Sequence, residues 1–379
     1  MGEGQMNMKI KILFIMDHFH FDSGGTERQV YEIIKGLDRS IFWVEACVFR
    51  YETNYFKQVK FPCPVFSPEI RSFFDPSTYL KLYRLRKYIQ SNKFDIVHIV
   101  FNDTAISIPP MMLGLKTKTV SMRRDMGFWY TPMKIMALRI NSIFTDLYLA
   151  NSNSVKENLH QKEWVPLRKI QIISNGVEFS RFDTPKDINI LHKLNISKGS
   201  PIVGIVANMR PVKRVKDLIH AFLYVEKRIP NSHLIIVGHL GDTFDEYMQI
   251  VRMSNIEQKV HFLGMIQDPV PIMKHFTVGV NCSETEGLSN SVIEYMACGV
   301  PVVATDTSGN RELILNEVNG LLVPVGKIND LADAIILILE QARLRDRLIS
   351  KAKENIVDRF ASDTIIKQYM MCYHNIIEK

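Results

Sequence analysis

The sequence of 379 residues lacks the features that mark membrane-spanning, disulfide-rich and metal-binding chains. No apolar run reaches the length of about 20 residues that a bilayer-spanning helix needs. Neither an HExxH motif nor a Cys/His cluster occurs, so we expect no metal site. The five cysteines are odd in number, scattered and never arranged as Cys-x-x-Cys, which indicates reduced thiols in a cytosolic protein: Cys47, Cys63, Cys282, Cys298 and Cys372.

The motifs of several enzyme classes are absent as well. The chain has no GxxxxGK[ST] phosphate loop and no GxSxG nucleophile elbow. The segment Asp22–Arg28 holds two glycines but lacks the third glycine of a GxGxxG dinucleotide fingerprint. Because no recognition motif for nucleic acids and no long basic run is present, we expect no nucleic-acid partner.

The net positive charge of the chain arises entirely in its first half. Residues 1–190 contain 26 Lys and Arg against 19 Asp and Glu, whereas residues 191–379 contain 21 of each. Such an excess can hold a protein on an acidic membrane leaflet, or it is simply a solvated surface. The basic and apolar stretches Thr78–Tyr88 and Met133–Ile143 favour peripheral membrane contact, although such stretches are more often core helices with solvated cations. We expect a cytoplasmic protein that can contact the inner face of the cytoplasmic membrane.

Short β-branched apolar runs alternate with helical patterns along the chain, which indicates parallel βαβ units. The length suits two domains. We therefore predict an α/β protein with two Rossmann-like domains, the first over residues 1–185 and the second over residues 190–358. A final helix is predicted over residues 362–379, and the polar stretch Phe179–Ser200 is the expected domain boundary.

The most informative segment is residues 283–304. Glu286 and Glu294 are separated by seven residues, and the polar turn between them opens an amphipathic helix. Gly299 ends this helix, and residues 301–304 follow as a buried parallel strand. One carboxylate thus lies on a loop before a helix and the other lies one turn inside it. The N–H groups at the start of such a helix can hold a phosphate.

This segment resembles the Glu-x7-Glu motif of retaining glycosyltransferases with the GT-B architecture, especially family 4, and the resemblance extends over nearly the whole chain. It implies two Rossmann-like domains facing a central cleft, with a C-terminal helix that crosses back to the first domain. It also implies a metal-independent retaining enzyme that moves a sugar from a nucleotide-diphosphate sugar, a UDP-sugar more readily than a GDP-sugar. The acceptor would be a glycan or a lipid-linked molecule in polysaccharide or cell-surface glycan synthesis. No cofactor other than this co-substrate is implied, and the lack of an Asp-x-Asp motif disfavours the metal-dependent GT-A type.

Two further loops carry the resemblance. Gly24 and Gly25 resemble the glycine-glycine-x-glutamate element that lies across the cleft from the donor pyrophosphate, although an ordinary tight turn between a strand and a helix is the alternative. The segment Val260–Gly264 resembles the strand and loop that touch the nucleobase through backbone groups. Because backbone groups carry this contact, the segment does not identify the base.

A third loop holds the cations. Lys213 matches the family lysine that holds the pyrophosphate, but Asn208 occupies the position of the family arginine. An asparagine cannot supply the charge of a guanidinium, so we expect Arg210 or Arg214 to replace it.

The resemblance also implies a role for each candidate residue. Glu294 would bind the ribose hydroxyls, and Glu286 would contact the donor sugar near the reacting carbon. Lys213 and Arg210 would stabilise the negative charge that develops on the leaving phosphate. The remaining donor-binding candidates are Gly24, Gly25, Asn208, Arg214, Gly264, Leu288, Ser289 and Asn290.

The acceptor side is expected in the first domain. Many family members have a histidine followed by an acid where this chain has Arg124 and Asp125, so the role of that histidine is not simply transferred. Arg123 and Arg124, with neighbouring aromatic residues, can meet a phosphate-bearing lipid or a sugar face. His98 lies on a strand whose end faces the cleft in the family, but a packed core histidine is an equally good interpretation.

Two alternative functions remain open at this point. A nucleotide-sugar 2-epimerase has a similar fold and needs no acceptor. A non-catalytic sugar-nucleotide binding subunit would tolerate the asparagine at position 208. Fold alone does not distinguish these functions from a transferase.

Overall fold

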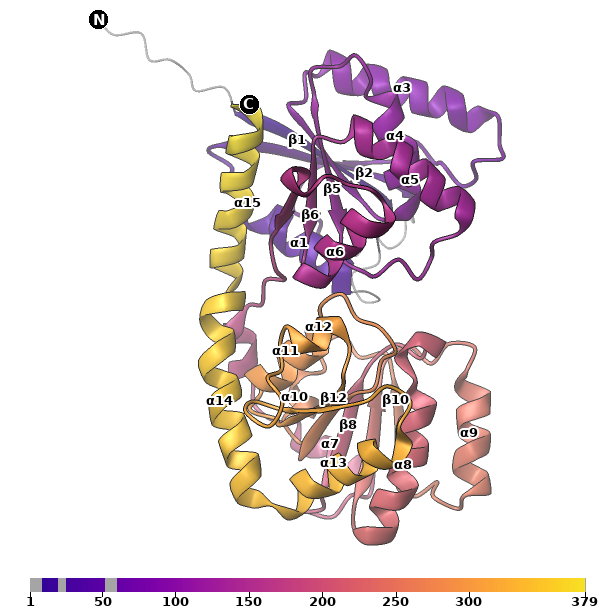
Figure 1. The fold of residues 1–379 in the computed structure, drawn as a ribbon, viewed down its shortest axis with the longest axis vertical. Helices are drawn as coiled ribbons and strands as arrows, with labels where there is room; N and C mark the ends of the chain where they lie inside the picture. The colour runs from indigo at the N-terminus through magenta and orange to yellow at the C-terminus, as the bar shows by residue number, and fades with distance from the viewer. Residues whose placement is uncertain (1–8, 20–24, 52–59, 379) are drawn as a thin grey trace, which may run out of the picture. The chain divides into compact units, whose positions relative to one another are not determined.

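The computed structural model describes residues 9–19, 25–51 and 60–378. The chain divides into two compact units (Figure 1), the first comprising residues 1–176 with 362–379 and the second residues 177–361. Each unit is built on one parallel sheet, as predicted.

The first unit has a seven-stranded sheet in the order β3-β2-β1-β4-β5-β6-β7, and every neighbouring pair is parallel. Its central strands are continuous apolar runs because helices cover both faces of the sheet. The strands are β1 (Ile10–His18), β2 (Phe42–Arg50), β3 (Val65–Phe66), β4 (Ile96–Val100), β5 (Lys118–Arg123), β6 (Leu147–Ala150) and β7 (Ile170–Ile172).

Two sets of helices bury the two faces of this sheet. Helices α1 (Gly25–Gly36) and α15 (Ser362–Ile377) share a core with one face. Helices α3 (Ser77–Ser91), α4 (Asn102–Met111) and α5 (Pro132–Phe144) bury the other. The short elements α6 (Asn153–Lys162) and η1 (Leu167–Lys169) follow β6.

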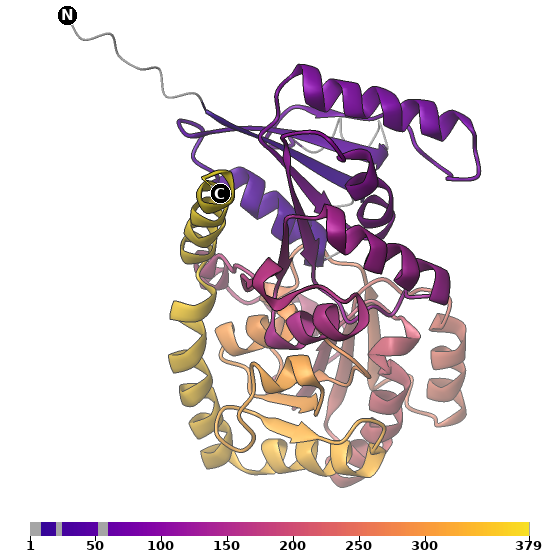
Figure 2. The same cartoon turned by 45° about the horizontal axis from the view of Figure 1, so that its top comes forward.

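Helix α15 returns to the first unit, so the predicted crossing of the C-terminal helix is confirmed. Its apolar stripe, which includes Tyr369 and Tyr373, is buried in the core of that unit. Figures 1 and 2 both show α15 beside α1. The helices approach closely at Gly36, where a Cβ atom would lie 2.2 Å from Cδ1 of Ile366.

The second unit has a six-stranded parallel sheet in the order β10-β9-β8-β11-β12-β13. Its strands are β8 (Ile202–Val206), β9 (His233–Val237), β10 (Val260–Gly264), β11 (Val278–Asn281), β12 (Val302–Thr305) and β13 (Leu321–Val323). The helices are η2 (Phe179–Asp183), α7 (Ile188–Lys193), η3 (Pro211–Lys213), α8 (Val215–Arg228), α9 (Phe244–Met253), α10 (Val270–Met273), α11 (Asn290–Ala297), α12 (Ser308–Arg311), α13 (Ile328–Glu340) and α14 (Ala342–Phe360).

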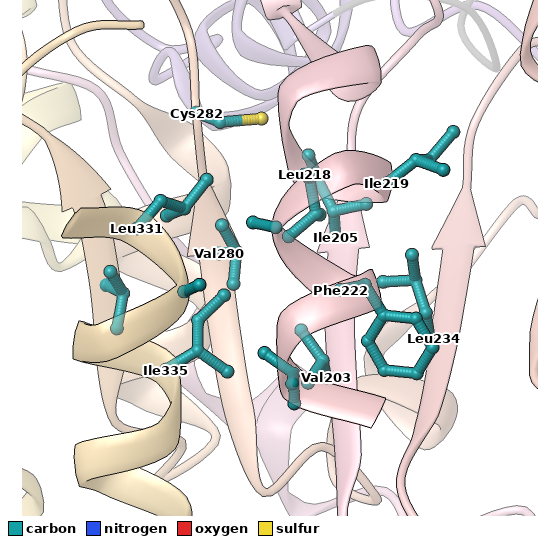
Figure 3. Packing of buried hydrophobic residues seen from close by; sticks show 14 of the residues in the cluster. Val203, Ile205, Leu218, Ile219, Phe222, Leu234, Val280, Cys282, Leu331 and Ile335 are labelled. Carbon is teal, nitrogen blue, oxygen red and sulfur yellow. The ribbon is translucent and has the colours of Figure 1, made fainter. Parts of the chain in front are cut away.

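The core on one face of this sheet is formed by α8 and α13 against β8 and β11 (Figure 3). Phe222 of α8 and Ile335 of α13 point into it together with Val203 and Val280 of the strands, and all four side chains are fully buried. The loops at the carboxyl ends of β8 and β11 are thereby held by a rigid, tightly packed base.

One predicted boundary is wrong. The first domain was expected to extend to residue 185, whereas residues 177–185 belong to the second unit. Val177 and Phe182 are buried in the core of the second unit, and the Val177 N–H donates to the Phe360 carbonyl at 2.7 Å. The stretch is polar overall, so its composition does not reveal that Val177 and Phe182 are buried. The sequence pattern therefore places the end of the first domain too late in the chain.

Candidate active site

The candidate site lies at the carboxyl edge of the second sheet, beside β8 and β11. These two neighbouring strands are the point where the strand order reverses, because β9 and β10 lie on one side and β12 and β13 on the other. Ligands of open α/β sheets bind at such a reversal point. The loop after β8 carries Lys213, and the loop after β11 carries Glu286.

Glu286 is the centre of a hydrogen-bonded cluster. Its Oε1 atom accepts from Lys213 Nζ at 2.7 Å, from Ser283 Oγ at 2.7 Å and from Asn281 Nδ2 at 3.1 Å. The Glu286 side chain is 10% exposed. Burial raises the pKa of Glu286, but the Lys213 ammonium and the three hydrogen bonds lower this pKa by more. The carboxylate is therefore ionised and held in one orientation.

Asn281 organises this cluster, and sequence reasoning missed it. Its amide nitrogen also donates to Ser289 Oγ at 2.9 Å, while its amide oxygen accepts from the Ser283 N–H at 3.3 Å and from Asn310 Nδ2 at 3.2 Å. Asn281 is 4% exposed and ends β11. The available signal was a polar residue at the carboxyl end of a buried strand, directly before the acidic loop.

The start of α11 is fixed by the same side chains. Ser289 is the N-cap, and its Oγ accepts from the Val292 N–H at 3.4 Å. The helix begins at Asn290. Leu288 is 7% exposed and belongs to the apolar core, so its side chain anchors the loop. The helix start lies directly after the loop that carries Glu286.

Glu294 lies in the second turn of α11 and is paired with an arginine. Arg181 Nη1 lies 3.0 Å from Glu294 Oε1, and Arg181 Nη2 lies 2.7 Å from Asp268 Oδ1. Burial lowers the pKa of Arg181, but the two carboxylates raise this pKa by more. Sequence reasoning did not single out Arg181, because it follows an apolar strand far from the acidic motif in the chain.

The other basic-loop candidates differ in their surroundings. Arg214 has a left-handed backbone with φ of 48°, and its Nε donates to Asp217 Oδ2 at 2.7 Å. Asn208 Oδ1 accepts from the His239 N–H at 3.0 Å, and Arg210 is exposed. Lys213 is the loop cation that contacts Glu286 among the residues that the structure describes.

Two glycine candidates are placed by the structure and a third is not. Gly264 ends β10 with φ of 69°, and its carbonyl accepts from the Gly238 N–H at 2.9 Å. A Cβ atom at Gly264 would meet nothing within 4 Å. In the first unit, Gly25 is the first residue of α1, whereas Gly24 lies outside the described residues.

His98 of the first unit has no exposed surface. Its Nδ1 lies 2.7 Å from the Tyr373 hydroxyl, and its ring stacks on Phe14 with a centroid distance of 4.7 Å. Burial lowers the pKa of His98 to about 3. His98 is therefore a packed core histidine, because α15 covers the face of β4 from which this side chain projects.

Arg124 and Asp125 follow β5 and are partly buried. The Arg124 guanidinium donates to the Asn175 side chain, and Asp125 Oδ1 accepts from the Gly127 N–H at 2.6 Å. Burial lowers the pKa of Arg124 and raises the pKa of Asp125. Both side chains therefore belong to a preformed polar network of the first unit.

Arg123, which was expected to meet a phosphate-bearing lipid or a sugar face, is buried inside the first unit. It is 6% exposed, and its Nε lies 3.2 Å from Oε1 of Glu163, a side chain with no exposed surface. The Tyr130 hydroxyl donates to the same carboxylate. Arg123 points back into the unit because Glu163 of the following helical segment provides the counter-charge that burial requires.

Comparison with known families identifies the chain. The profile of the family described as Glycosyl transferases group 1 matches residues 187–355, and that of Glycosyltransferase Family 4 matches residues 23–181. Between them the two profiles cover most of both units. The chain is a group 1 glycosyltransferase.

Individual relatives of this glycosyltransferase are distant. It is 26% identical over 301 residues to the N-acetyl-alpha-D-glucosaminyl L-malate synthase of Bacillus anthracis, and the aligned region covers 78% of each of the two chains. It is 24% identical over 302 residues to the UDP-Gal:alpha-D-GlcNAc-diphosphoundecaprenol alpha-1,3-galactosyltransferase of Escherichia coli, 76% of each chain. The structure of Anabaena HepE in complex with UDP and glucose aligns with a TM-score of 0.83 at 22% identity, over 97% of this chain and 100% of that one. The predicted GT-B fold is confirmed.

Two features are absent from the part of the chain that the structure describes. No group of three or more His, Cys, Asp or Glu side chains is arranged to hold a metal ion in the described part of the chain. Within the same residues, no helix combines the length and apolarity that a membrane crossing needs.

Proposed function

We propose that this glycosyltransferase is a retaining, metal-independent enzyme that uses a UDP-sugar and extends a cell-surface glycan or lipid-linked acceptor. The observation that carries this proposal is the contact of Lys213 with Glu286 beside the capped start of α11. Lysine, carboxylate and helix start are the three groups that a sugar diphosphate needs at one place.

The proposed chemistry assigns one task to each group. Breaking the bond between sugar and phosphate develops positive charge on the sugar ring and negative charge on the leaving phosphate. Lys213 and the N–H groups at the start of α11 stabilise the phosphate charge, and they do so more strongly in the transition state than in the ground state. Glu286 contacts the donor sugar near the reacting carbon, and Glu294 binds the ribose. The acceptor attacks on the leaving-group side, so no protein nucleophile takes part.

The choice of donor and acceptor is supported by the comparisons. HepE binds UDP and glucose in its crystal structure, and the name of the Escherichia coli relative contains UDP-Gal and a diphosphoundecaprenol acceptor. Arg124 and Asp125 of the first unit are the proposed acceptor-side groups, and Arg210 is the proposed second cation of the donor loop because it is exposed.

A panel of UDP- and GDP-sugars tests the donor site. We expect saturable binding of a UDP-sugar, weakened at least tenfold by Lys213→Ala and by Glu294→Ala. Lys216→Ala is the matched control, because Lys216 is an exposed cation of α8 that pairs with Glu246 at 2.5 Å outside the cluster. Unchanged binding in both site variants would refute the proposal. Incubation with donor alone tests the epimerase, since a new sugar epimer would favour that alternative over slow hydrolysis.

Peripheral membrane contact is a finer part of the proposal, and the outer side of α5 supports it. Residues 77–144, which contain α3, α4 and α5, hold eleven Lys and Arg against three Asp. Helix α5 itself has no acidic residue and leaves four large apolar side chains exposed on one stripe: Met133, Met136, Ile140 and Ile143. Apolar residues flanked by cations match the chemistry of an anionic lipid leaflet.

Sedimentation with anionic vesicles tests this contact. We expect binding at low salt that decreases as the salt concentration rises, and a loss of several fold in Met133→Glu/Ile143→Glu. Met253→Glu is the control, since Met253 is 77% exposed in the second unit. Absence of binding at low salt would remove the membrane from the proposal.

A further inference from the structure

Arg181 joins two carboxylates of the second unit and has no part in the reaction described above. It lies in η2, on a backbone that is anchored on both sides. Val177 and Phe182 are 9% and 8% exposed in the core, and the Val177 N–H donates to the Phe360 carbonyl at 2.7 Å. The guanidinium is therefore presented from a fixed position.

The guanidinium uses separate nitrogens for the two acids. Nε and Nη2 donate to Asp268 Oδ1 at 3.1 and 2.7 Å, and Nη1 donates to Glu294 Oε1 at 3.0 Å. Asp268 Oδ1 also accepts from the Val270 N–H at 3.2 Å, at the start of α10. Asp268 thus orients one edge of the guanidinium, and the remaining nitrogen is aimed at Glu294.

The pair with Glu294 is the more buried of the two. The Glu294 side chain is 12% exposed, whereas the Asp268 side chain is 42% exposed. A carboxylate at this depth is stabilised by a counter-charge, and Arg181 supplies one beside the helix whose first residues are proposed to hold a diphosphate. Lysine would keep the charge but could not bridge both acids in this planar geometry.

We propose that Arg181 is a positioning residue that fixes the Glu294 carboxylate for the donor ribose and neutralises its charge as the anionic nucleotide binds. This inference rests on the proposed function, because it takes Glu294 as the ribose ligand. Arg181 acts through Glu294 and does not itself touch the reacting atoms. A residue of η2 thereby supports Glu294, the proposed ribose ligand of the donor site.

A double-mutant cycle with UDP as the probe tests this role. We expect Arg181→Ala and Glu294→Ala each to weaken UDP binding about tenfold in calorimetric titrations. The double variant is expected to bind UDP within twofold of Glu294→Ala, because Arg181 has nothing left to position. In turnover assays, Arg181→Ala should raise the donor KM about tenfold with kcat changed less than twofold, since ribose binding is equal in ground and transition states.

Three further variants separate positioning from general structure. Arg181→Lys is expected to recover part of the UDP affinity, and Asp268→Asn to lose less than Arg181→Ala, because the contact with Glu294 survives. Both also keep the test valid if Arg181→Ala does not fold. Arg228→Ala is the control: Arg228 pairs with Glu340 at 2.8 Å and is 65% exposed, so UDP affinity should not change.

The outcomes distinguish this inference from the proposed function. If Glu294→Ala weakens UDP binding and Arg181→Ala does not, Arg181 has no positioning role and the donor site stands. An additive loss of about a hundredfold in the double variant also overturns the inference, since the two residues would then act independently. If Glu294→Ala leaves UDP binding unchanged, both the ribose assignment and the inference fail.

Discussion

At the scale of single residues, the candidate site depends on a neutral amide as much as on charges. Asn281 donates to Glu286 and Ser289 and accepts from Ser283 and Asn310. All of its polar capacity is used in a buried position, where an unpaired group is costly. One side chain thereby couples the orientation of the acid to the start of α11.

Asn281→Ala should therefore damage both stability and activity. We expect a loss of about 2–3 kcal/mol in the unfolding free energy, because several buried partners lose a hydrogen bond. We expect kcat/KM to fall about a hundredfold, as Glu286 is no longer oriented. Urea titration followed by circular dichroism and initial-rate kinetics measure the two effects.

Asn319→Ala is the matched control for this substitution. Asn319 is 3% exposed and bonds the Leu315 N–H at 2.8 Å and the Leu313 carbonyl at 3.0 Å, outside the cluster. It should lose comparable stability and keep its kcat/KM. Equal kinetic losses in both variants would show that Asn281 acts only through stability.

The acid itself makes stability depend on pH. The pKa of Glu286 is lowered from its ordinary 4.5, so its ionised form stabilises the folded state. This contribution is complete above about pH 4.5 and is lost as the pH falls through the lower pKa of the folded state. The difference in unfolding free energy between the natural chain and Glu286→Gln should shrink below pH 4.5. A constant difference down to pH 3 would contradict the shift.

At the scale of elements, two neighbouring glycines leave room for aromatic side chains to pack against β8 and β11. Gly204 and Gly279 are in register. A Cβ atom at Gly204 would lie 2.1 Å from Cδ2 of Phe276, and one at Gly279 would lie 2.6 Å from Cγ of Tyr295. The Tyr295 hydroxyl accepts from the Val206 N–H at 2.6 Å, so the ring connects α11 to β8.

Gly279→Ala tests this packing. The methyl group overlaps the Tyr295 ring, and we expect a loss of about 1–3 kcal/mol of unfolding free energy with a weaker donor site. In a Tyr295→Leu background the same substitution should cost less, because the ring is gone. Equal costs in both backgrounds, measured by urea titration, would disprove the contact as the cause.

At the scale of the whole molecule, α15 completes the first unit from the far end of the chain. The contact between His98 Nδ1 and the Tyr373 hydroxyl joins residues 275 positions apart. Burial holds the pKa of His98 at about 3 against an ordinary 6.5. Below pH 6.5 the His98 side chain is protonated in the unfolded chain but stays neutral in the folded unit. The free energy of unfolding therefore falls as the pH decreases from 6.5 toward 3.

His98→Asn should remove this part of the pH dependence. Asparagine can bond Tyr373 but does not titrate between pH 6.5 and 5, where His98 contributes up to about 1.4 kcal/mol per pH unit. All three tryptophans lie in the first unit, so urea unfolding followed by tryptophan fluorescence reports on it. Equal slopes for the natural chain and the variant would mean that His98 is protonated when folded.

The sequence by itself determined the fold class, most of the strands and the acidic motif. Buried parallel strands are written as continuous apolar runs, and Glu286 and Glu294 are close enough in the chain for local spacing to reveal them. The strands β3 and β13 have two and three residues, too few to show a periodic pattern.

Only the tertiary structure decided which polar side chains contact one another. Lys213 lies 73 positions from Glu286, and Arg181 lies 113 positions from Glu294. Which side chains are buried and which are paired depends on which elements become neighbours. For this reason Arg123 lies in the core beside Glu163, His98 is buried beneath α15, and Asn281 lies at the centre of the Glu286 cluster. Local spacing carries no record of such distant contacts, because tertiary packing decides which elements of the chain become neighbours.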